Sequence, residues 1–352
     1  MTRFRLERRE RTPVLVQLLV PVAAVAVALV LCSGLVRLAG TGILHAYGLL
    51  FLSTFQTAYD IEDTLIKAAP LLLTGLAVAV AFRARFWNIG AEGQLMAGAV
   101  VAGFVGERSW LPAFSLVPLM ILGAAAAGAL WALLPALLKL RLKVDDVVTT
   151  LLLNSIMLYG VMALLEGPWK DPRGGYPNSP SIRPAAEFPI LAGTELHLGI
   201  LVALLATILV WWAMARTTLG FAIRAVGHNP LASAYAGIPV GRIVLLAAIM
   251  SGALAGLAGA GEVGGVRYQV TSDLSSGYGY AGIVIATLAE LNPLAVVPAA
   301  LFFAVIFNGA GSMARSTGVP VYLADVIQGV ALLSMVAGRL FMVYRLRVAH
   351  HA

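Results

Sequence analysis

The chain has 352 residues, of which 60% are hydrophobic and only 12% are charged, against about 25% charged residues in an ordinary soluble domain. This composition, with a mean hydropathy of +0.90, excludes a water-soluble fold of this length and also a disordered or collagen-like chain. The formal net charge of +7 fits cations gathered in inner loops better than nucleic-acid binding. The single cysteine, Cys32, excludes an intrachain disulfide and a cysteine metal site. We expect neither a metal ion nor a cofactor.

Long apolar segments follow one another along the chain. The first runs from Val14 to Val36, about 35 Å as a helix, and so can cross a hydrocarbon core of about 30 Å. Segment 279–291 is too short to cross alone, and Asn292-Pro293 directly after it predicts a pair of broken half-spans. The other predicted spans are residues 63–82, 86–105, 113–138, 146–166, 198–215, 243–262, 294–312 and 320–338.

The pattern predicts an all-α fold, a polytopic membrane bundle of about ten spans in a single domain over residues 1–352. Within it, residues 1–13 form a cytoplasmic basic tail, 167–197 an extracytoplasmic loop, and 217–241 a cytoplasmic loop.

Positive charge sets the orientation of this bundle. With the N-terminus inside, sixteen of the 24 Lys and Arg residues fall in inner segments and seven in outer ones, with Lys67 left inside a span. Cations accumulate in cytoplasmic loops, so both termini are predicted to be cytoplasmic. The outer seven are Arg37, Arg108, Lys170, Arg173, Arg183, Arg267 and Arg315.

Small residues recur at four-residue spacing inside the spans. Gly252, Gly256 and Ala260 form one series, and Ala124 and Gly128 form another. Small side chains at this spacing let membrane helices approach closely. The series predict tight packing and no chemistry.

A run of polar residues opens the span after Phe86-Trp87, where Asn88, Glu92 and Gln94 stand close together. A carboxylate at the centre of a membrane costs about 2.5–3.5 kcal/mol on insertion scales, so it should face a partner, a cavity or water. Two interpretations stay open: a buried network that anchors one helix, or a wall of a translocation path. The candidate path residues are Asn88, Glu92, Gln94, Asn154, Asn308 and Gln328.

The inner loop contains a short segment with helix signals at both ends. Asn229 is a good N-cap and Pro230 suits the first helical position, while Gly237 and Pro239 suit the end. A short rigid helix on the cytoplasmic face can dock into a groove of a partner, although an ordinary interfacial loop is the plainer alternative. The candidate coupling residues are Arg224, Gly227, Asn229, Ala232, Ala234 and Gly237.

Several enzyme motifs are absent or false. The Gly-x-Gly-x-x-Gly match at residues 259–264 ends a membrane span and follows no strand, so it is not a dinucleotide site. The chain has no Gly-Lys dipeptide and therefore no Walker A loop, and it has no His-Glu-x-x-His motif. We expect no ATP hydrolysis by this chain.

Five stretches together resemble the permease subunits of ATP-binding-cassette importers of the branched-chain amino acid/ribose class, and most closely the longer permease of nucleoside uptake systems. They are residues 69–77, 88–94, 167–169, 224–238 and 251–259. The resemblance implies a ten-span, non-catalytic subunit of the bacterial inner membrane. It also implies three partners: an ATPase with a tandem cassette, a second homologous permease and a substrate-binding lipoprotein. No nucleic acid is implied.

Two positions depart from the family pattern. Asp145-Asp146 replaces an Asn-Glu type pair, and either residue can cap the span that begins at Val147. Glu290 stands where relatives are glycine-rich or basic, and it would alter solute preference if it faced the path. The solute is expected to be a nucleoside, with stacking surfaces available from Trp87, Tyr159, Tyr278, Tyr280 and Phe307.

Alternative functions remain. A sugar or an amino acid is an alternative solute for such a permease. An ion-coupled secondary transporter is another alternative, because Glu92, Glu262, Asp325 and the Asn292-Pro293 break are features of that class. A membrane enzyme is the third, but no convergent set of acid, base or metal residues supports it.

Overall fold

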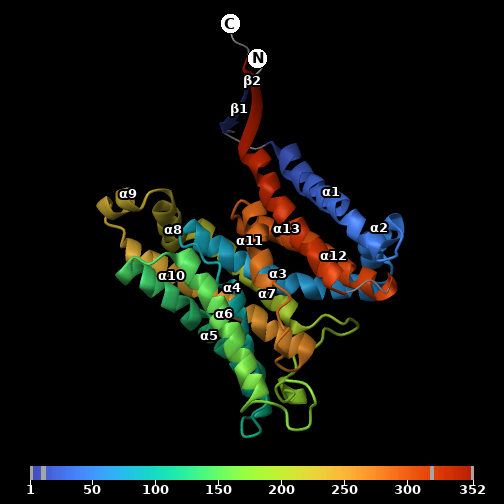
Figure 1. The fold of residues 1–352 in the computed structure, drawn as a ribbon. Coiled ribbons are helices and arrows are strands. Elements are labelled where there is room, and N and C mark those ends of the chain that lie inside the picture. Colours follow the sequence, from blue (N-terminus) through green and yellow to red (C-terminus); the bar gives the residue numbers. More distant parts are fainter. Residues whose placement is uncertain (1–2, 9–12, 318–320, 350–352) are drawn as a thin grey trace. The chain divides into compact units, whose positions relative to one another are not determined.

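The computed structural model describes residues 3–8, 13–317 and 321–349, and Figure 1 shows a structure built almost wholly of helices. The first half contains β1 (Arg3–Arg8), α1 (Val14–Leu38), α2 (Ile43–Leu52), η1 (Ser53–Phe55), α3 (Ala58–Arg83), α4 (Ala91–Gly106), α5 (Ala113–Leu142) and α6 (Asp146–Glu166). The second half contains η2 (Pro184–Ala186), α7 (Leu198–Arg216), α8 (Thr218–His228), α9 (Pro230–Tyr235), α10 (Val240–Glu262), the π-helical turn η3 (Val263–Arg267), α11 (Tyr278–Leu288), α12 (Pro293–Thr317), α13 (Val321–Val343) and β2 (Tyr344–Ala349).

Among the described residues, six helices are long and apolar enough to cross a membrane: α3, α5, α6, α7, α10 together with η3, and α12. Shorter apolar helices include α4 and α11. Each predicted span coincides with a helix, except that residue 320, where the last one was expected to begin, lies outside the described residues. The all-helical membrane fold is thus confirmed, while the count of ten spans and their orientation stay predictions.

The chain forms two compact units, one of residues 1–61 and 305–352 (unit 1) and one of residues 62–304 (unit 2). In unit 2, α10 packs against α4 and α5 along the small residues predicted to do so. A Cβ added at Gly128 would collide with the backbone at Gly252, and one at Gly98 would collide with the backbone at Gly256. Because backbones touch at these points, the glycines cannot be enlarged without separating the helices.

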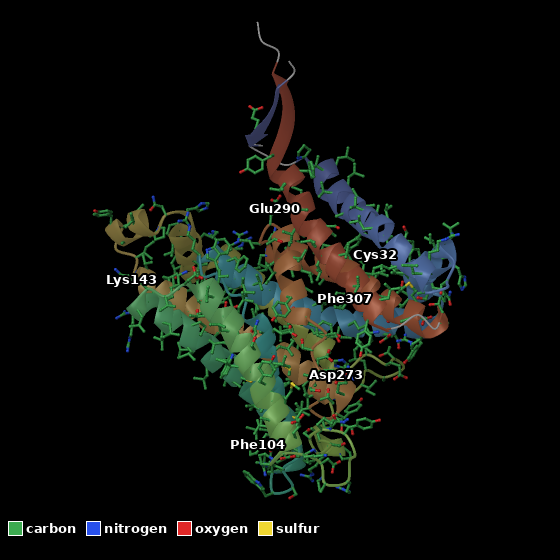
Figure 2. The ribbon with its side chains drawn as sticks, viewed as in Figure 1. Cys32, Phe104, Lys143, Asp273, Glu290 and Phe307 are labelled. Atoms are coloured by element: carbon green, nitrogen blue, oxygen red, sulfur yellow. The ribbon has the colours of Figure 1, made fainter. Side chains whose placement is uncertain are left out.

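The half-span α11 lies against α3 in unit 2. The Thr74 hydroxyl of α3 donates to the Tyr278 carbonyl at the start of α11 (2.9 Å). The break after α11 is confirmed: the helix has 11 residues, Glu290 and Leu291 take left-handed conformations (φ 51° and 60°), and α12 begins at Pro293. Glu290 is exposed in this turn (Figure 2) and does not line the cavity described below.

Unit 1 is assembled from both ends of the chain. Helices α1 and α13 pack together. Its core joins residues of α1, α2, α12 and α13, namely Cys32, Val36, Ala46, Leu50, Ala310, Met313, Ala314 and Ile327. Cys32 is therefore a packing residue of this core.

Two short strands lie outside the helices, one in the segment expected to be a basic tail and one after α13. Strands β1 and β2 pair antiparallel, with Phe4 opposite Val348 and Leu6 opposite Leu346. In both segments charged and apolar residues alternate with period two, which is the pattern of a strand and not of a helix. The pairing brings the two ends of the chain side by side.

Candidate functional site

A closed network of amides fixes the start of α4. The Asn88 and Gln94 side chains are both buried and form two hydrogen bonds with each other. Asn88 Nδ2 donates to Gln94 Oε1, and Gln94 Nε2 donates to Asn88 Oδ1 (2.9 Å each). Asn88 Nδ2 also donates to the Ser251 hydroxyl on α10 (2.8 Å), and Asn88 Oδ1 accepts from the Gly90 N–H (3.0 Å). The sequence-predicted pair Asn88 and Gln94 thus meets inside the protein, and its hydrogen bonds join α4 to α10.

Glu92, in the first turn of α4, and Asn154, on α6, lie beside this network. Asn154 Oδ1 accepts from the Gly93 N–H (2.9 Å), and its Nδ2 donates to the Ile89 carbonyl (2.9 Å). Glu92 Oε2 accepts from the Gly279 N–H (2.7 Å) near the start of α11. Glu92 and Asn154 both line a cavity of about 230 Å³. Of the predicted path residues, these two are the ones that line it.

The remaining two path candidates lie in unit 1. Asn308, on α12, is buried and donates to the Asp60 carbonyl (3.3 Å). Gln328 belongs to α13, and its side chain lies outside the described part of the structure.

A chain of polar contacts lies at the end of unit 2 that carries Lys143, which Figure 2 shows opposite the end that carries Phe104. Asp145 caps α6, its Oδ1 accepting from the Val148 N–H (3.0 Å). Asp146 Oδ2 instead accepts from the Trp87 N–H (2.6 Å) and pairs with Lys139 Nζ (2.5 Å). Of the two aspartates, Asp145 is therefore the cap.

The same chain of contacts reaches the predicted coupling segment. Lys139 Nζ donates to the Arg85 carbonyl (2.6 Å), and Arg85 donates through its guanidinium to the His228 carbonyl (3.1 Å). A Cβ at Gly227 would collide with the Arg83 carbonyl, so α8 contacts the end of α3 at this glycine. The guanidinium of Arg224 donates to the Met214 carbonyl of α7.

The short helix expected in the inner loop is confirmed as α9. Asn229 is its N-cap, with Oδ1 accepting from the Ala232 N–H (3.1 Å), Pro230 is its first residue, and Gly237 has a φ of +81°. The helix spans six residues, fewer than the expected 228–237. Ala232 and Ala234 are exposed, as docking requires.

Sequence reasoning missed the largest exposed side chains of α9. Leu231 is 75% exposed and Tyr235 is 94% exposed. They are four residues apart and therefore share one face of the helix. That spacing was the signal that could have identified them.

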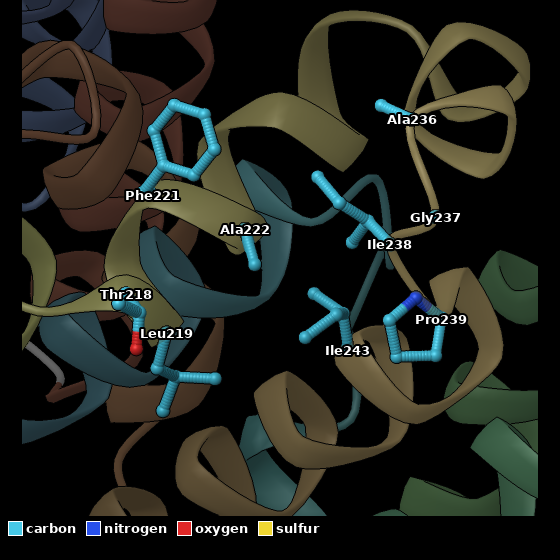
Figure 3. Close-up of a pocket in the computed structure, with 9 residues that line it drawn as sticks. All are labelled: Thr218, Leu219, Phe221, Ala222, Ala236, Gly237, Ile238, Pro239 and Ile243. Atoms are coloured by element: carbon cyan, nitrogen blue, oxygen red, sulfur yellow. The ribbon is translucent and has the colours of Figure 1, made fainter.

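A groove of about 450 Å³ lies beside α9 (Figure 3). Its walls come from α8, from the segment that links α9 to α10, and from Ile243 of α10. Phe221, Ile238 and Pro239 make the groove largely apolar.

At the start of α7, His197 is buried. Its Nδ1 accepts from the Gly199 N–H (3.1 Å), and Gly199 and Gly265 leave space for its ring. Burial lowers the pKa of His197 to about 4, so the ring is neutral at physiological pH. Among the described residues, no group of three or more His, Cys, Asp or Glu is arranged to hold a metal ion.

Residues 60–336 match the family described as the permease component of branched-chain amino acid transport systems. The chain belongs to this family. It is 36% identical to the guanosine ABC transporter permease NupP of Bacillus subtilis (90% of this chain, 92% of the relative) and 36% identical to the glucose ABC transporter permease TsgB13 of Haloferax volcanii (86% and 83%). It is 31% identical to the nucleoside permease NupB of Lactococcus lactis (88% of each). No solved structure matches the chain.

Family membership establishes the general role. The protein is a multi-pass permease subunit of an ATP-binding-cassette transporter in the cytoplasmic membrane. Such a subunit works with an ATPase and a substrate-binding protein.

Proposed function

We propose that this permease forms part of the path by which an importer carries nucleosides, while a separate tandem-cassette ATPase hydrolyses ATP. The observation that carries the proposal is the similarity over about nine-tenths of the chain to guanosine and nucleoside permeases. The polar cavity beside Glu92 and Asn154 supports it, because a neutral polar solute needs hydrogen-bonding groups inside the membrane.

A second candidate solute is glucose, favoured by the equally identical permease of Haloferax volcanii. Family membership argues against the ion-coupled transporter, since ATP would drive uptake. The decisive measurement is uptake by the reconstituted complex with nucleosides, sugars and amino acids as competitors. Uptake should stop on ATP depletion and survive an uncoupler; the reverse pattern would reject the importer.

The partner of this chain in the membrane is proposed to be a second, homologous permease. In each of three organisms the chain matches two permeases, and its sequence identity to one is higher than to the other. The identities are 36% and 27% in Bacillus subtilis, 31% and 25% in Lactococcus lactis, and 36% and 27% in Haloferax volcanii. The chain corresponds to the better-matched member of each pair. A substrate-binding lipoprotein is proposed to deliver the solute from outside.

We assign the two predicted sets of residues different parts in transport. Glu92 and Asn154 are proposed to contact solute, whereas Asn88 and Gln94, whose hydrogen bonds are closed on each other, are proposed to support that wall. Asn308 and Gln328 are proposed to belong to the same path.

Helix α9 is proposed to dock into a groove of the ATPase and to transmit its closure. The contacts from the His228 carbonyl through Arg85, Lys139 and Asp146 to the Trp87 N–H form a continuous link from the end of α8, where α9 is attached, to the segment before α4. A movement of α9 would therefore reach the polar network beside the cavity. Arg224 and Gly227 hold α8 against α7 and α3, which gives the link a rigid base.

The variant Ala232→Trp tests this coupling. Overpacking a close contact typically costs ~1–3 kcal/mol, which would weaken docking by ~5–150-fold. Transport should fall, and stimulation of the ATPase by loaded binding protein should fall with it, while membrane insertion is unchanged. Wild-type values for both activities would remove α9 from the coupling role.

A further inference from the structure

The cavity of about 230 Å³ in unit 2 has an unusual lining for a membrane protein. Its polar residues are one carboxylate, one amide and four hydroxyls, contributed by α4, α6, the segment before α11, and α11: Glu92, Asn154, Ser155, Ser272, Ser275 and Tyr280. In the described part of the chain, no Lys, Arg or His lines it. It therefore offers many hydrogen-bonding groups and a single carboxyl group.

Glu92 is held so that acceptor capacity remains. One carboxylate oxygen accepts from the Gly279 N–H at 2.7 Å, in the first turn of α11. That bond fixes the side chain across two helices. An ionised carboxylate has about four lone-pair sites, so Glu92 can accept further hydrogen bonds from a solute.

Hydroxyl groups surround this carboxylate. Ser275 lies beside it, and its buried hydroxyl faces the Glu92 carboxyl group. Asn154, fixed by the backbone of α4, donates to the Tyr280 hydroxyl (3.3 Å). A hydroxyl group both donates and accepts hydrogen bonds, so these groups can also bond a hydroxylated ligand in the cavity.

The lining selects a chemical class. A carboxyl group with no cation among the described lining residues offers phosphates and carboxylic acids no opposite charge, but its oxygens accept hydrogen bonds from neutral hydroxyl groups. The volume is below the roughly 300–1,000 Å³ of a site that encloses a whole small molecule. The cavity therefore fits one hydroxylated part of a solute better than an entire nucleoside.

We propose that this cavity binds the vicinal hydroxyls of the solute's sugar moiety, with Glu92 as the specificity-determining acceptor. The inference rests on the proposed function, since it describes how the permease recognises the solute that the importer carries. Selection then depends on the sugar and leaves the base outside this cavity. One such site would serve nucleosides and simple sugars alike.

The test compares Glu92→Gln with wild type in the reconstituted complex, with the same binding protein in both. Uptake is measured for a ribonucleoside and for its 2′-deoxy and 3′-deoxy analogues. Because the binding protein is unchanged, its own preference cancels in the ratio of variant to wild type. Replacement of the carboxyl group by an amide should weaken the hydrogen bond to the solute and lower ribonucleoside uptake by about 10-fold, while uptake of the deoxy analogue that lacks the bound hydroxyl should change by less than about 2-fold.

Glu107→Gln is the matched control, because Glu107 directly follows α4 and bonds Trp169 outside the cavity (3.1 Å). It should leave all the ratios unchanged. Ser155→Ala is a milder second variant for the case that the Glu92→Gln complex does not assemble. It should lower uptake of the ribonucleoside more than uptake of the deoxy analogue, but by a smaller factor. An equal fall for ribo and deoxy solutes in these variants would overturn the proposal.

A second measurement is independent of transport. In a Cys32→Ala background, Ser155→Cys is labelled with a small thiol reagent in the assembled complex. A ribonucleoside or glucose should slow labelling, whereas the free base and a 2′,3′-dideoxynucleoside should not. If no hydroxylated solute protects the cysteine, the proposal fails even though the complex transports nucleosides. If the complex carries glucose and no nucleoside, the nucleoside assignment fails. The same measurements made with glucose and with 2-deoxyglucose then decide the proposal.

Discussion

Asn88 makes four hydrogen bonds while fully buried, two with Gln94, one with Ser251 and one with the Gly90 N–H. Removal of one partner from such a network leaves the others buried and unpaired, which costs more than the bond itself contributes. The arrangement explains how three polar groups can lie inside a membrane protein.

Asn88→Ala tests whether this network supports the fold or the path. Each buried group left unpaired costs about 1–3 kcal/mol, so the variant should lower the free energy of unfolding by at least that amount. Thermal unfolding of the purified permease in detergent measures it, with the exposed residue Gln56 changed to Ala as the control. Unchanged stability with lost transport would instead place Asn88 in the solute path.

His197 should make stability depend on pH. Its folded pKa of about 4 lies below the ordinary value of 6.5, so the unfolded chain binds more protons between these pH values and stability rises with pH. Stability should be complete above pH 6.5 and decline as pH falls toward 4. At about 1.4 kcal/mol per pKa unit, the loss should reach about 3 kcal/mol.

The control for this prediction is His197→Asn. Asn keeps an acceptor for the Gly199 N–H as a helix N-cap and does not titrate. The fall of the melting temperature between pH 7 and pH 5 should be smaller in the variant. An identical fall in both proteins would assign the acid sensitivity to other groups.

Single residues were predicted from sequence only in part. The polar character of Asn88, Glu92 and Asn154 marked them as buried and important, because polar groups within spans need partners. Their partners could not be predicted: Ser251 is 163 residues from Asn88, and Gly279 is 187 residues from Glu92. Only the folded arrangement of the helices shows which hydrogen bonds are closed and which groups border a cavity.

At the scale of elements, short helices with strong local signals were predictable. The cap at Asn229, the proline after it and the left-handed Gly237 are local chemistry, and α9 follows from them. The strands β1 and β2 were missed, since each has six residues and their pairing joins opposite ends of the sequence. Their period-two alternation was visible, but residues 1–13 were interpreted as a basic tail, and no element was predicted for residues 344–349.

Leu231→Ala and Tyr235→Ala test which face of α9 contacts the ATPase. Truncation of a buried apolar or aromatic side chain at an interface typically lowers the binding free energy by ~2 kcal/mol or more, which is about a 30-fold loss of affinity. Binding of the ATPase to the detergent-solubilised permease should weaken accordingly. Leu142→Ala, a 67% exposed leucine at the end of α5, is the control and should bind normally. Normal binding by both α9 variants would show that docking uses the alanine face.

Two glycines on neighbouring helices should respond oppositely to alanine. Gly128 contacts the α10 backbone, so Gly128→Ala must push α5 and α10 apart and lower the yield of folded protein. Gly160, on α6, has open space around a Cβ, and Gly160→Ala should be neutral or stabilise the helix by up to about 1 kcal/mol. Size-exclusion profiles and melting temperatures separate the two. Tolerance of alanine at Gly128 would refute the close packing.

At the scale of the molecule, the paired strands support the predicted orientation. Because β1 and β2 pair along their whole length, we expect both ends of the chain to lie on one side of the membrane. This requires an even number of crossings, as ten spans would provide. The charge bias then favours the cytoplasmic side.

Cysteine labelling decides the orientation, provided that the sites are accessible. Ser179 and Ser233 are buried and unsuitable, whereas Tyr176 is 78% exposed and Ala234 is also exposed. In a Cys32→Ala background, a membrane-impermeant reagent applied to intact cells should label Tyr176→Cys and not Ala234→Cys. Inverted vesicles should give the opposite result. Labelling of Ala234→Cys in intact cells would reverse the topology.

The discontinuous composition of unit 1 has a consequence for biosynthesis. Unit 2 is one uninterrupted stretch, whereas unit 1 needs residues from both ends of the chain. Domains form as the chain emerges at about 5–20 residues per second, so unit 2 can fold while β1 still lacks its partner strand. During that interval β1 has unpaired backbone groups that can pair with other chains. Completion of the permease therefore depends on its last residues, and a truncation after Ala304 should leave unit 2 folded and unit 1 incomplete.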